Sequence, residues 1–293
     1  MEIQMNEQSA SPKEQLSQAG FEIVASHSVF TALVSRLREL GGVAVAFSGG
    51  VDSTFLAFVA RAVLGRDGVQ AITAVSPSLG SGEFEHCRYL AELWDIPFLS
   101  VLTREMENPN YLANREDRCY WCKAELMSSI APIIESTNFH VVLGVNLDDL
   151  GDHRPGQQAA KEASAFFPLV DAGYTKTLIR EHSRELGLST WDRPQSACLA
   201  SRIPYGTPVS LPILAQLDRA EAALKRLGFA QVRVRHYDSL ARIEFTIEDL
   251  ERALEKRVEI VAAVRRAGYD YVTVDLEGFR SGNLNSKIIP QVS

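Results

Sequence analysis

The stretch AFSGGVDST, at residues 46–54, places glycines, hydroxyls and a carboxylate between an apolar run and an apolar helical pattern. Glycines let the backbone approach an anion closely, and the first-turn amides of a helix supply positive potential. The stretch lacks the lysine that contacts the transferred γ-phosphate in GxxxxGK[ST] loops. We therefore expect it to hold a pyrophosphate leaving group while the chemistry takes place at the α-phosphate. The predicted nucleotide ligands are Ser48, Gly49, Gly50, Asp52, Ser53 and Thr54.

A second polar segment, GVNLDDLGDHRPG, follows an apolar strand pattern. Doubly wound sheets bind ligands at the carboxyl ends of their strands, so this segment is expected near the glycine loop. Asp148 and Asp149 can hold Mg²⁺ on the phosphates, unless they belong to an acidic surface loop. A lysine at the start of a later helix can supply the missing cation or can simply be solvated. The predicted ligands of this second group are Asn146, Asp149, Arg154 and Lys176.

The four cysteines are Cys87, Cys119, Cys122 and Cys198. The CxxC of RCYWCK begins a helical pattern and puts two thiols on one turn, which suits metal ligation. No second CxxC or paired histidine completes a zinc site, whereas three cysteines suit a 4Fe–4S cluster with one open iron. A redox thiol pair with a buried Cys198 is the competing interpretation. Cys87 lies in an apolar helical pattern and is expected to be a packed thiol.

Arginines surround the third cysteine of this set. Arg193 and Arg202 lie close to Cys198 in sequence, and cationic neighbours lower a thiol pKa and favour the nucleophilic thiolate. Further along, Arg233 and Arg235 alternate in an RVR strand pattern, so both guanidinium groups are expected on one side. They can bind a second anion, or they can line a solvated strand face.

The elements that must position these residues change in pattern near residue 200. Before it, apolar strands alternate with helices, which predicts an α/β fold with a doubly wound parallel sheet covered on both faces. After it, a helix, a strand pair, a helix and a strand predict a smaller α+β domain. Proline and glycine cluster at the boundary, in SRIPYGTP. The predicted units are a disordered tail at 1–22, a nucleotide domain at 23–200 and a C-terminal domain at 201–293.

Bulk properties narrow the function classes. The net charge of −7 over 293 residues argues against a nucleic-acid-binding protein. No apolar stretch approaches the roughly 18 residues that a membrane span needs. The polar, acidic N-terminus lacks the features of a signal peptide. We therefore expect a cytoplasmic protein without membrane or nucleic-acid partners, in which cysteines are thiols or metal ligands.

Several strings together resemble one family. SGGxDS is similar to the loop of the PP-loop pyrophosphatase superfamily, which includes GMP synthetase, NAD synthetase and tRNA-thiolating enzymes. The whole set resembles the LarE family over roughly residues 28–287: SGGVDSTFLAFVA, RCYWCKAEL, NLDDLGDHRPG, SACLASRIPYGTPVS, VRVRHYDSLARIEF and YDYVTVDLEGFRSGNLN. The resemblance implies an ATP-dependent, AMP- and pyrophosphate-forming sulfurtransferase. Its expected substrate is a pyridinium-3,5-dicarboxylate mononucleotide, the precursor of a nickel-pincer cofactor, whose carboxylate becomes a thiocarboxylate.

The resemblance also implies site residues and cofactors. One family strategy sacrifices the sulfur of a cysteine matching Cys198, and the other binds a 4Fe–4S cluster through three cysteines and adds a sulfide. This sequence has the three-cysteine arrangement, so the expected cofactors are ATP, Mg²⁺ and a 4Fe–4S cluster, with sulfide or another sulfur donor and a homo-oligomeric assembly. Val145 departs from the family's GTN string. The residues implied for the cluster and the substrate are Cys119, Cys122, Cys198, Glu221, Arg233 and Arg235.

Other interpretations remain open at the level of sequence. The glycine stretch by itself can be a turn with a serine N-cap. A tRNA thiolase shares the loop and often a cluster, although the acidic charge and the lack of an obvious RNA-binding module argue against it. An amidating ligase, or its synthetase subunit, would not need three cysteines. A regulator that has lost its chemistry would not need the intact loop and cysteines.

Overall fold

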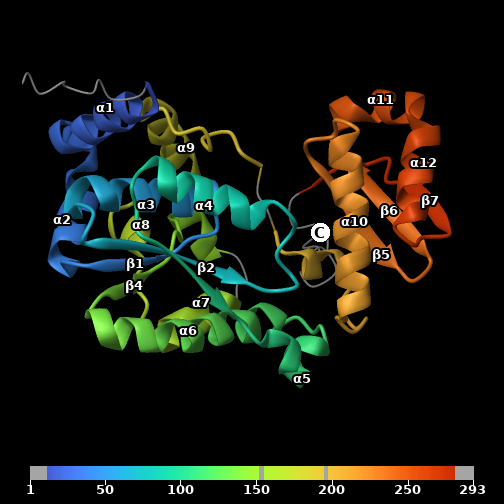
Figure 1. The fold of residues 1–293 in the computed structure, drawn as a ribbon, viewed down its shortest axis with the longest axis horizontal. Helices are drawn as coiled ribbons and strands as arrows, with labels where there is room; N and C mark the ends of the chain where they lie inside the picture. Colours follow the sequence, from blue (N-terminus) through green and yellow to red (C-terminus); the bar gives the residue numbers. More distant parts are fainter. Residues whose placement is uncertain (1–11, 152–154, 195–196, 281–293) are drawn as a thin grey trace, which may run out of the picture.

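The computed structural model of the chain describes residues 12–151, 155–194 and 197–280. It has a larger N-terminal α/β part and a smaller C-terminal α+β part, which lie side by side (Figure 1). Among the described residues, no helix combines the length and the apolar character needed to cross a membrane.

The N-terminal part is built on a parallel sheet, as expected from its apolar strands. Its strand order is β3-β2-β1-β4 and every pairing is parallel. Parallel strands that follow one another in the sequence must be joined by crossover connections. These connections are helices, and they cover both faces of the sheet. The strands are β1 (Val43–Ala46), β2 (Val69–Val75), β3 (Phe98–Leu102) and β4 (His140–Val142).

Helices cover both faces of this sheet (Figure 1), and an apolar core lies on each face. One face packs against α1 (Pro12–Ser26), α2 (Thr31–Leu40), α3 (Val51–Leu64), α4 (Glu83–Leu93) and α9 (Lys176–Glu185). The other packs against α6 (Arg118–Thr137) and α7 (Pro155–Glu162). Shorter segments complete this part: η1 (Ser28–Phe30), η2 (Glu105–Glu107), α5 (Pro109–Leu112), η3 (Leu147–Gly151) and α8 (Pro168–Asp171).

The expected tail over residues 1–22 is shorter in the structure. Residues 1–11 lie outside the described residues, but α1 begins at Pro12 and continues beyond the expected boundary. Val24 is buried, and the Phe21 ring lies 4.8 Å from that of Phe58 on α3. Burial of these two side chains against α3 stabilises a helix whose polar N-terminal composition suggested disorder.

The C-terminal part contains a three-stranded sheet with the order β5-β6-β7. Strands β5 (Val232–Tyr237) and β6 (Leu240–Phe245) form the expected antiparallel hairpin, while β7 (Tyr271–Val274) pairs with β6 in parallel. Helix α10 (Leu211–Arg226) packs on the sheet. The helix expected after the strand pair consists of three pieces: η5 (Ile247–Asp249), α11 (Leu250–Glu255) and α12 (Arg257–Arg266).

The C-terminal core also includes residues from the N-terminal part. Tyr111 of α5 is buried in it, and Trp121 and Cys122 at the start of α6 pack against it. The short helix η4 (Leu199–Arg202), directly after Cys198, supplies Leu199 and other side chains to the same core. The CxxC turn and the Cys198 segment therefore meet where the two parts of the chain join.

Candidate functional site

The glycine loop connects β1 to α3 at the carboxyl end of the parallel sheet. Gly49 has φ = +66°, a left-handed conformation that favours glycine, and Gly50 is the N-cap of α3. The Ser53 hydroxyl donates to the Gly50 carbonyl over 3.2 Å and lies 3.1 Å from the Ser48 hydroxyl. Thr54 is fully buried, below the loop surface. The loop thus has the strand, turn and helix N-terminus that an anion site requires.

Lys176 lies next to this loop although it is far away in sequence. Its Nζ is 2.5 Å from Oδ2 of Asp52, in the first turn of α3. Lys176 is also the first residue of α9, and its backbone N–H donates to the Asp148 carboxylate over 2.7 Å. The structure therefore brings a lysine to a loop that has none of its own.

The segment after β4 packs directly on the start of α3. A Cβ added to Gly144 would lie 2.7 Å from the Ser53 backbone nitrogen, so only glycine fits this approach. Asn146 is buried, and its side-chain oxygen accepts hydrogen bonds from the N–H groups of Asp148 and Asp149 at 3.0 and 3.3 Å. Asn146 Nδ2 in turn donates to Asp52 over 3.4 Å. Arg154, expected in this group, lies outside the described residues.

The three cysteines gather where the two parts join. Cys119 and Cys122 lie in the first turn of α6, and Cys198 is the N-cap of η4. Burial raises the pKa of Cys122 to about 12, and the charges of Cys198 and Glu105 add to this effect. Packing around the Cys119 thiol raises its pKa as well, although Cys119 and Cys198 both keep exposed surface. The charge of Cys198 contributes to both raised pKa values, so the three thiols lie close enough together to interact electrostatically.

A buried arginine fixes the CxxC turn relative to Cys198. Arg118 Nη1 donates to the Asn114 side chain at 2.5 Å and to the Ala200 carbonyl at 2.8 Å. Asn114 Nδ2 donates to the carbonyls of Pro204 and Thr207, both at 2.8 Å. Arg118, which directly precedes Cys119, therefore connects the CxxC turn to the short helix η4, which begins after Cys198.

The described residues hold no group of three or more His, Cys, Asp or Glu side chains that could bind one metal ion. A single tetrahedral ion with Zn–S distances near 2.3 Å would require its sulfur ligands within about 4 Å of one another. A four-iron cluster is larger than one ion and holds its thiolates further apart. The described residues, the three cysteines included, therefore provide no site for a single metal ion.

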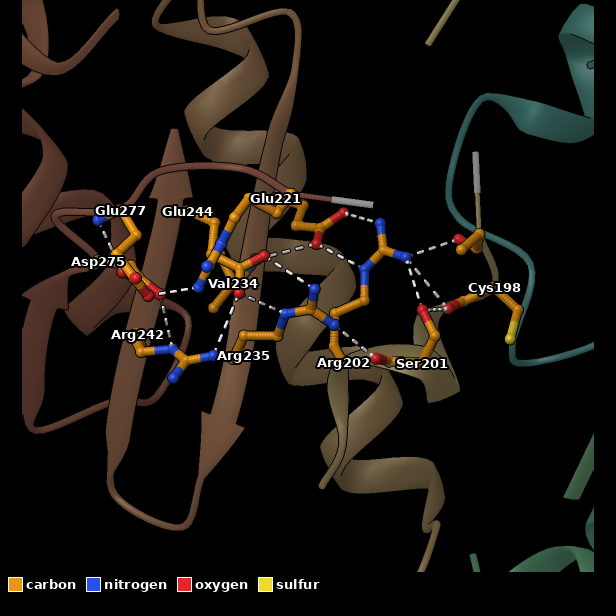
Figure 2. Close-up of polar contacts among 12 residues, drawn as sticks. Cys198, Ser201, Arg202, Glu221, Val234, Arg235, Arg242, Glu244, Asp275 and Glu277 are labelled. Atoms are coloured by element: carbon orange, nitrogen blue, oxygen red, sulfur yellow. Dashed lines mark hydrogen bonds and ion pairs between the residues drawn. The ribbon is translucent and has the colours of Figure 1, made fainter. Parts of the chain in front are cut away.

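A chain of buried ion pairs runs from the C-terminal sheet to the Cys198 segment (Figure 2). Arg202 makes two contacts with the Glu221 carboxylate, at 2.8 and 3.0 Å, and donates to the carbonyls of Ala197 and Cys198 at 2.7 and 3.2 Å. Because these contacts run from one guanidinium group to the Glu221 side chain and to two carbonyls, Arg202 holds both the cysteine backbone and α10.

A second pair extends this chain. Arg235 makes two contacts with Glu244, at 2.9 and 2.8 Å, and donates to the Ser201 carbonyl over 2.8 Å (Figure 2). Glu221 also accepts from the Val234 N–H at 3.0 Å. Glu221 and Arg235, expected around the substrate, are therefore occupied in supporting the loop that contains Cys198.

Arg233 has a different place from Arg235, although both side chains belong to β5. It lines a cleft between the two parts of the chain, together with Glu83, Arg193, Lys225 and Phe279. Burial lowers the pKa of Arg233 to about 10, and the positive charges of Arg202 and Arg235 lower it further. The lining of the cleft contains four cationic side chains and two carboxylates, and this excess of positive charge favours a bound anion.

The two arginines of β5 should differ in their effect on stability. Arg235→Gln should lower the melting temperature. The loss in the free energy of unfolding should lie at the lower end of the roughly 3–5 kcal/mol expected for a broken buried ion pair, because Arg242 still contacts Glu244. Arg233→Gln should lower the melting temperature less, because burial disfavours the Arg233 charge at every pH below about 10 and this cost offsets the lost contact with the Phe279 ring. Thermal unfolding at pH 7 measures both. Equal destabilisation by the two variants would contradict this assignment.

Sequence reasoning missed several residues that the structure brings to the site. Arg118 directly precedes the CxxC, and a buried cation next to two thiols could have been suspected from that position alone. Asn114 has φ = +51°, which no sequence pattern indicated. Glu244 and Glu83 had no motif to mark them, because their partners Arg235 and Arg193 are known only from the fold.

Known proteins are similar to most of the chain. An uncharacterized protein of Synechocystis sp. is 46% identical over 250 residues, which cover 84% of this chain and 93% of that protein. The pyridinium-3,5-bisthiocarboxylic acid mononucleotide synthase of Lactiplantibacillus plantarum is 36% identical over 257 residues, or 87% of this chain and 93% of that enzyme. An uncharacterized protein of Methanocaldococcus jannaschii is 26% identical over 238 residues, 81% of this chain and 90% of that protein. No protein-family model matches the chain.

Proposed function

The chain belongs to the LarE family of pyridinium-3,5-bisthiocarboxylic acid mononucleotide synthases, and we propose that it converts a carboxylate of a pyridinium mononucleotide to a thiocarboxylate in an ATP-dependent reaction. The observation that supports this most strongly is the shared location of three thiols and a cationic cleft at the junction of the two parts. A phosphate loop without thiols would suit many ligases, but this combination suits sulfur transfer.

The first step in this proposal is adenylation of the substrate carboxylate. The carboxylate oxygen attacks the α-phosphorus of ATP, the bond to the bridging oxygen breaks, and pyrophosphate leaves. The glycine-loop amides and Lys176 would stabilise the negative charge on that leaving group. Asp148 and Asp149 would hold Mg²⁺ on the phosphates, and a backbone hydrogen bond to each carboxylate fixes its position.

The second step replaces AMP by sulfur. A sulfur nucleophile attacks the acyl carbon, the C–S bond forms, and the bond to the AMP oxygen breaks. A 4Fe–4S cluster, when bound, supplies an open iron that can carry an added sulfide. Cys119, Cys122 and Cys198 would hold it, because all three lie where the two parts of the chain join, with the Arg118 cation next to Cys119. Cys198 as a sacrificial donor is the alternative.

The cleft residue Arg233 would bind the substrate's phosphate or second carboxylate. Its pKa is lowered mainly by burial, so a bound anion, which stabilises the charged guanidinium, would be favoured there. A tRNA thiolase is less favoured, because the net charge is −7 and the cationic groups lie in a cleft rather than on an extended face. We expect the enzyme to work as a homo-oligomer in the cytoplasm.

Incubation of the anaerobic protein with ATP, sulfide and the pyridinium dicarboxylate mononucleotide tests this proposal. We expect AMP and pyrophosphate in equal amounts with the thiocarboxylate, and no product without ATP. Arg233→Gln should raise the KM for the mononucleotide by about tenfold or more, the loss expected for one charge-assisted contact, with little change in the KM for ATP. Thiolation of tRNA, or formation of a carboxamide from ammonia, would contradict the proposal.

A further inference from the structure

Arg193 connects the glycine loop to α4 through its guanidinium group. Nη1 donates to the Gly49 carbonyl over 2.8 Å, and Nη2 contacts both oxygens of Glu83 at 3.0 Å. The two side chains are mostly buried, with exposed fractions of 21% and 13%. In sequence terms Arg193 was only a cationic neighbour of Cys198. In the structure its charge is directed to the nucleotide loop instead.

The Gly49 backbone needs such support. Its φ of +66° belongs to a region that glycine enters freely, so the peptide units around it can rotate at low cost. A Cβ added to Gly49 would lie 2.9 Å from the His86 ring, 3.0 Å from the Cys87 sulfur and 3.4 Å from Arg193 Nη1. One side of the loop is therefore packed against α4 and Arg193, and the Gly49 carbonyl points to that side.

A fixed carbonyl also fixes the N–H of the next residue. The described chain has no cis peptide bonds, so the Gly49 C=O and the Gly50 N–H point in opposite directions across one rigid plane. With the carbonyl held by Arg193, the Gly50 N–H points to the other side of the loop, away from α4. A rotated peptide would instead turn a carbonyl oxygen toward any bound phosphate and repel it.

We propose that Arg193 is a positioning residue of the nucleotide loop, which with Glu83 fixes the Gly49–Gly50 peptide so that Gly50 N–H is presented to the pyrophosphate part of ATP. This inference rests on the proposed ATP-dependent function and names a residue that acts through the loop. Glu83 keeps the guanidinium plane in place through two contacts, and the remaining Nη1 is directed at the carbonyl. A lysine could not make both sets of contacts.

The backbone of Arg193 is held as well as its side chain. Arg180 of α9 donates to the carbonyls of Trp191 and Arg193, at 2.7 and 3.1 Å. These bonds fix the backbone from which the Arg193 side chain extends, on the helix that Lys176 begins. The guanidinium group is therefore positioned from both ends, by Arg180 at its backbone and by Glu83 at its tip.

Binding of ATP, pyrophosphate and AMP to three variants tests this inference. Arg193→Gln should weaken ATP and pyrophosphate binding roughly 10- to 100-fold, the loss expected for charge-assisted contacts, and leave AMP binding unchanged because AMP has no pyrophosphate part. Glu83→Gln should change the same two ligands by a smaller factor. Arg88→Gln is the matched control, since Arg88 lies on α4 and contacts only exposed glutamates.

Two outcomes would overturn the inference. One is unchanged ATP and pyrophosphate binding by Arg193→Gln at an unchanged melting temperature. The other is an equal loss of AMP binding, which would indicate a general structural role. If Arg193→Gln does not fold, Glu83→Gln decides by the same criterion. A wild-type protein that binds neither ATP nor pyrophosphate would overturn the proposed function as well, whereas wild-type binding with unaffected variants would overturn the inference alone.

Discussion

Replacing Lys176 with alanine should slow the release of pyrophosphate from ATP by ~10²-fold or more, while the protein keeps its fold. The glycine loop contributes N–H groups and hydroxyls but no cation of its own. The structure places Lys176 at the start of α3, with Nζ 2.5 Å from Asp52, whereas Arg193 contacts the Gly49 carbonyl on the α4 side. Removal of Lys176 takes away the positive charge that would meet the developing charge of the leaving group, and it also leaves Asp52 next to the phosphates without its partner.

The measurement is the rate of pyrophosphate release with the mononucleotide present, together with the melting temperature. Lys161→Ala serves as the control, because Lys161 is an exposed lysine on α7 that contacts the Phe167 ring instead of the loop. Asp52→Ala should also reduce the rate, because it releases Lys176 and the Asn146 side chain together. Release of ADP and phosphate by the wild-type enzyme would show that the loop holds a transferred group and would contradict this account.

Sequence patterns within a few residues correctly predicted the elements that are specified by neighbouring residues. The apolar run at residues 43–47, the glycines and the apolar helix after them specify strand, loop and helix in consecutive residues, and the structure has that arrangement. The CxxC begins a helix as expected. Lys176 was a plausible phosphate ligand because the loop lacked one, and the structure brings it to Asp52 across 124 positions.

The remaining contacts depend on partners that are distant in sequence. Arg193 was interpreted through its proximity to Cys198, yet it donates to Gly49, 144 positions away. Arg235 was expected to face an anion with Arg233, because alternation on a strand gives direction but not partners. The partner of Arg235 proved to be Glu244 on the next strand of the hairpin. The helix α1 was missed because its stability comes from packing on α3 rather than from its own composition.

Buried ion pairs support the Cys198 segment at a cost in desolvation, so their presence needs a reason other than stability. Arg202 and Arg235 together hold the carbonyls of Ala197, Cys198 and Ser201. The Ala197 and Cys198 carbonyls lie on either side of the Cys198 Cα, so fixing them determines the position and direction of the Cys198 side chain. We interpret the chain of ion pairs as a rigid support for this cysteine, in the same way that Arg118 supports the turn of Cys119.

Substitution of the cysteines should have the largest effect on thiocarboxylate formation, because the cluster route and the sacrificial route use different cysteines. A sacrificial route needs one thiolate, at Cys198, to attack the acyl-adenylate and then undergo elimination across its own Cα–Cβ bond. That route gives no role to Cys119 or Cys122. A cluster route needs all three thiolates to hold the irons, with one iron open for sulfide. Because Cys119 and Cys122 pack at the same junction as Cys198, we expect the cluster route.

Anaerobically purified protein should therefore be brown and contain about four irons per chain, and it should turn over repeatedly when sulfide is supplied. Cys119→Ala, Cys122→Ala and Cys198→Ala should each lose the colour, the iron and the thiocarboxylate product. Cys87→Ala should keep all three, because Cys87 is fully buried under the glycine loop with its pKa raised to about 11 by burial, away from the other thiols. Iron analysis, absorption spectra and product yield per chain distinguish these cases. If the Cys119 and Cys122 variants instead complete one turnover, and Cys198 becomes lighter by the mass of one hydrogen sulfide, the cluster is wrong and Cys198 is the sulfur donor.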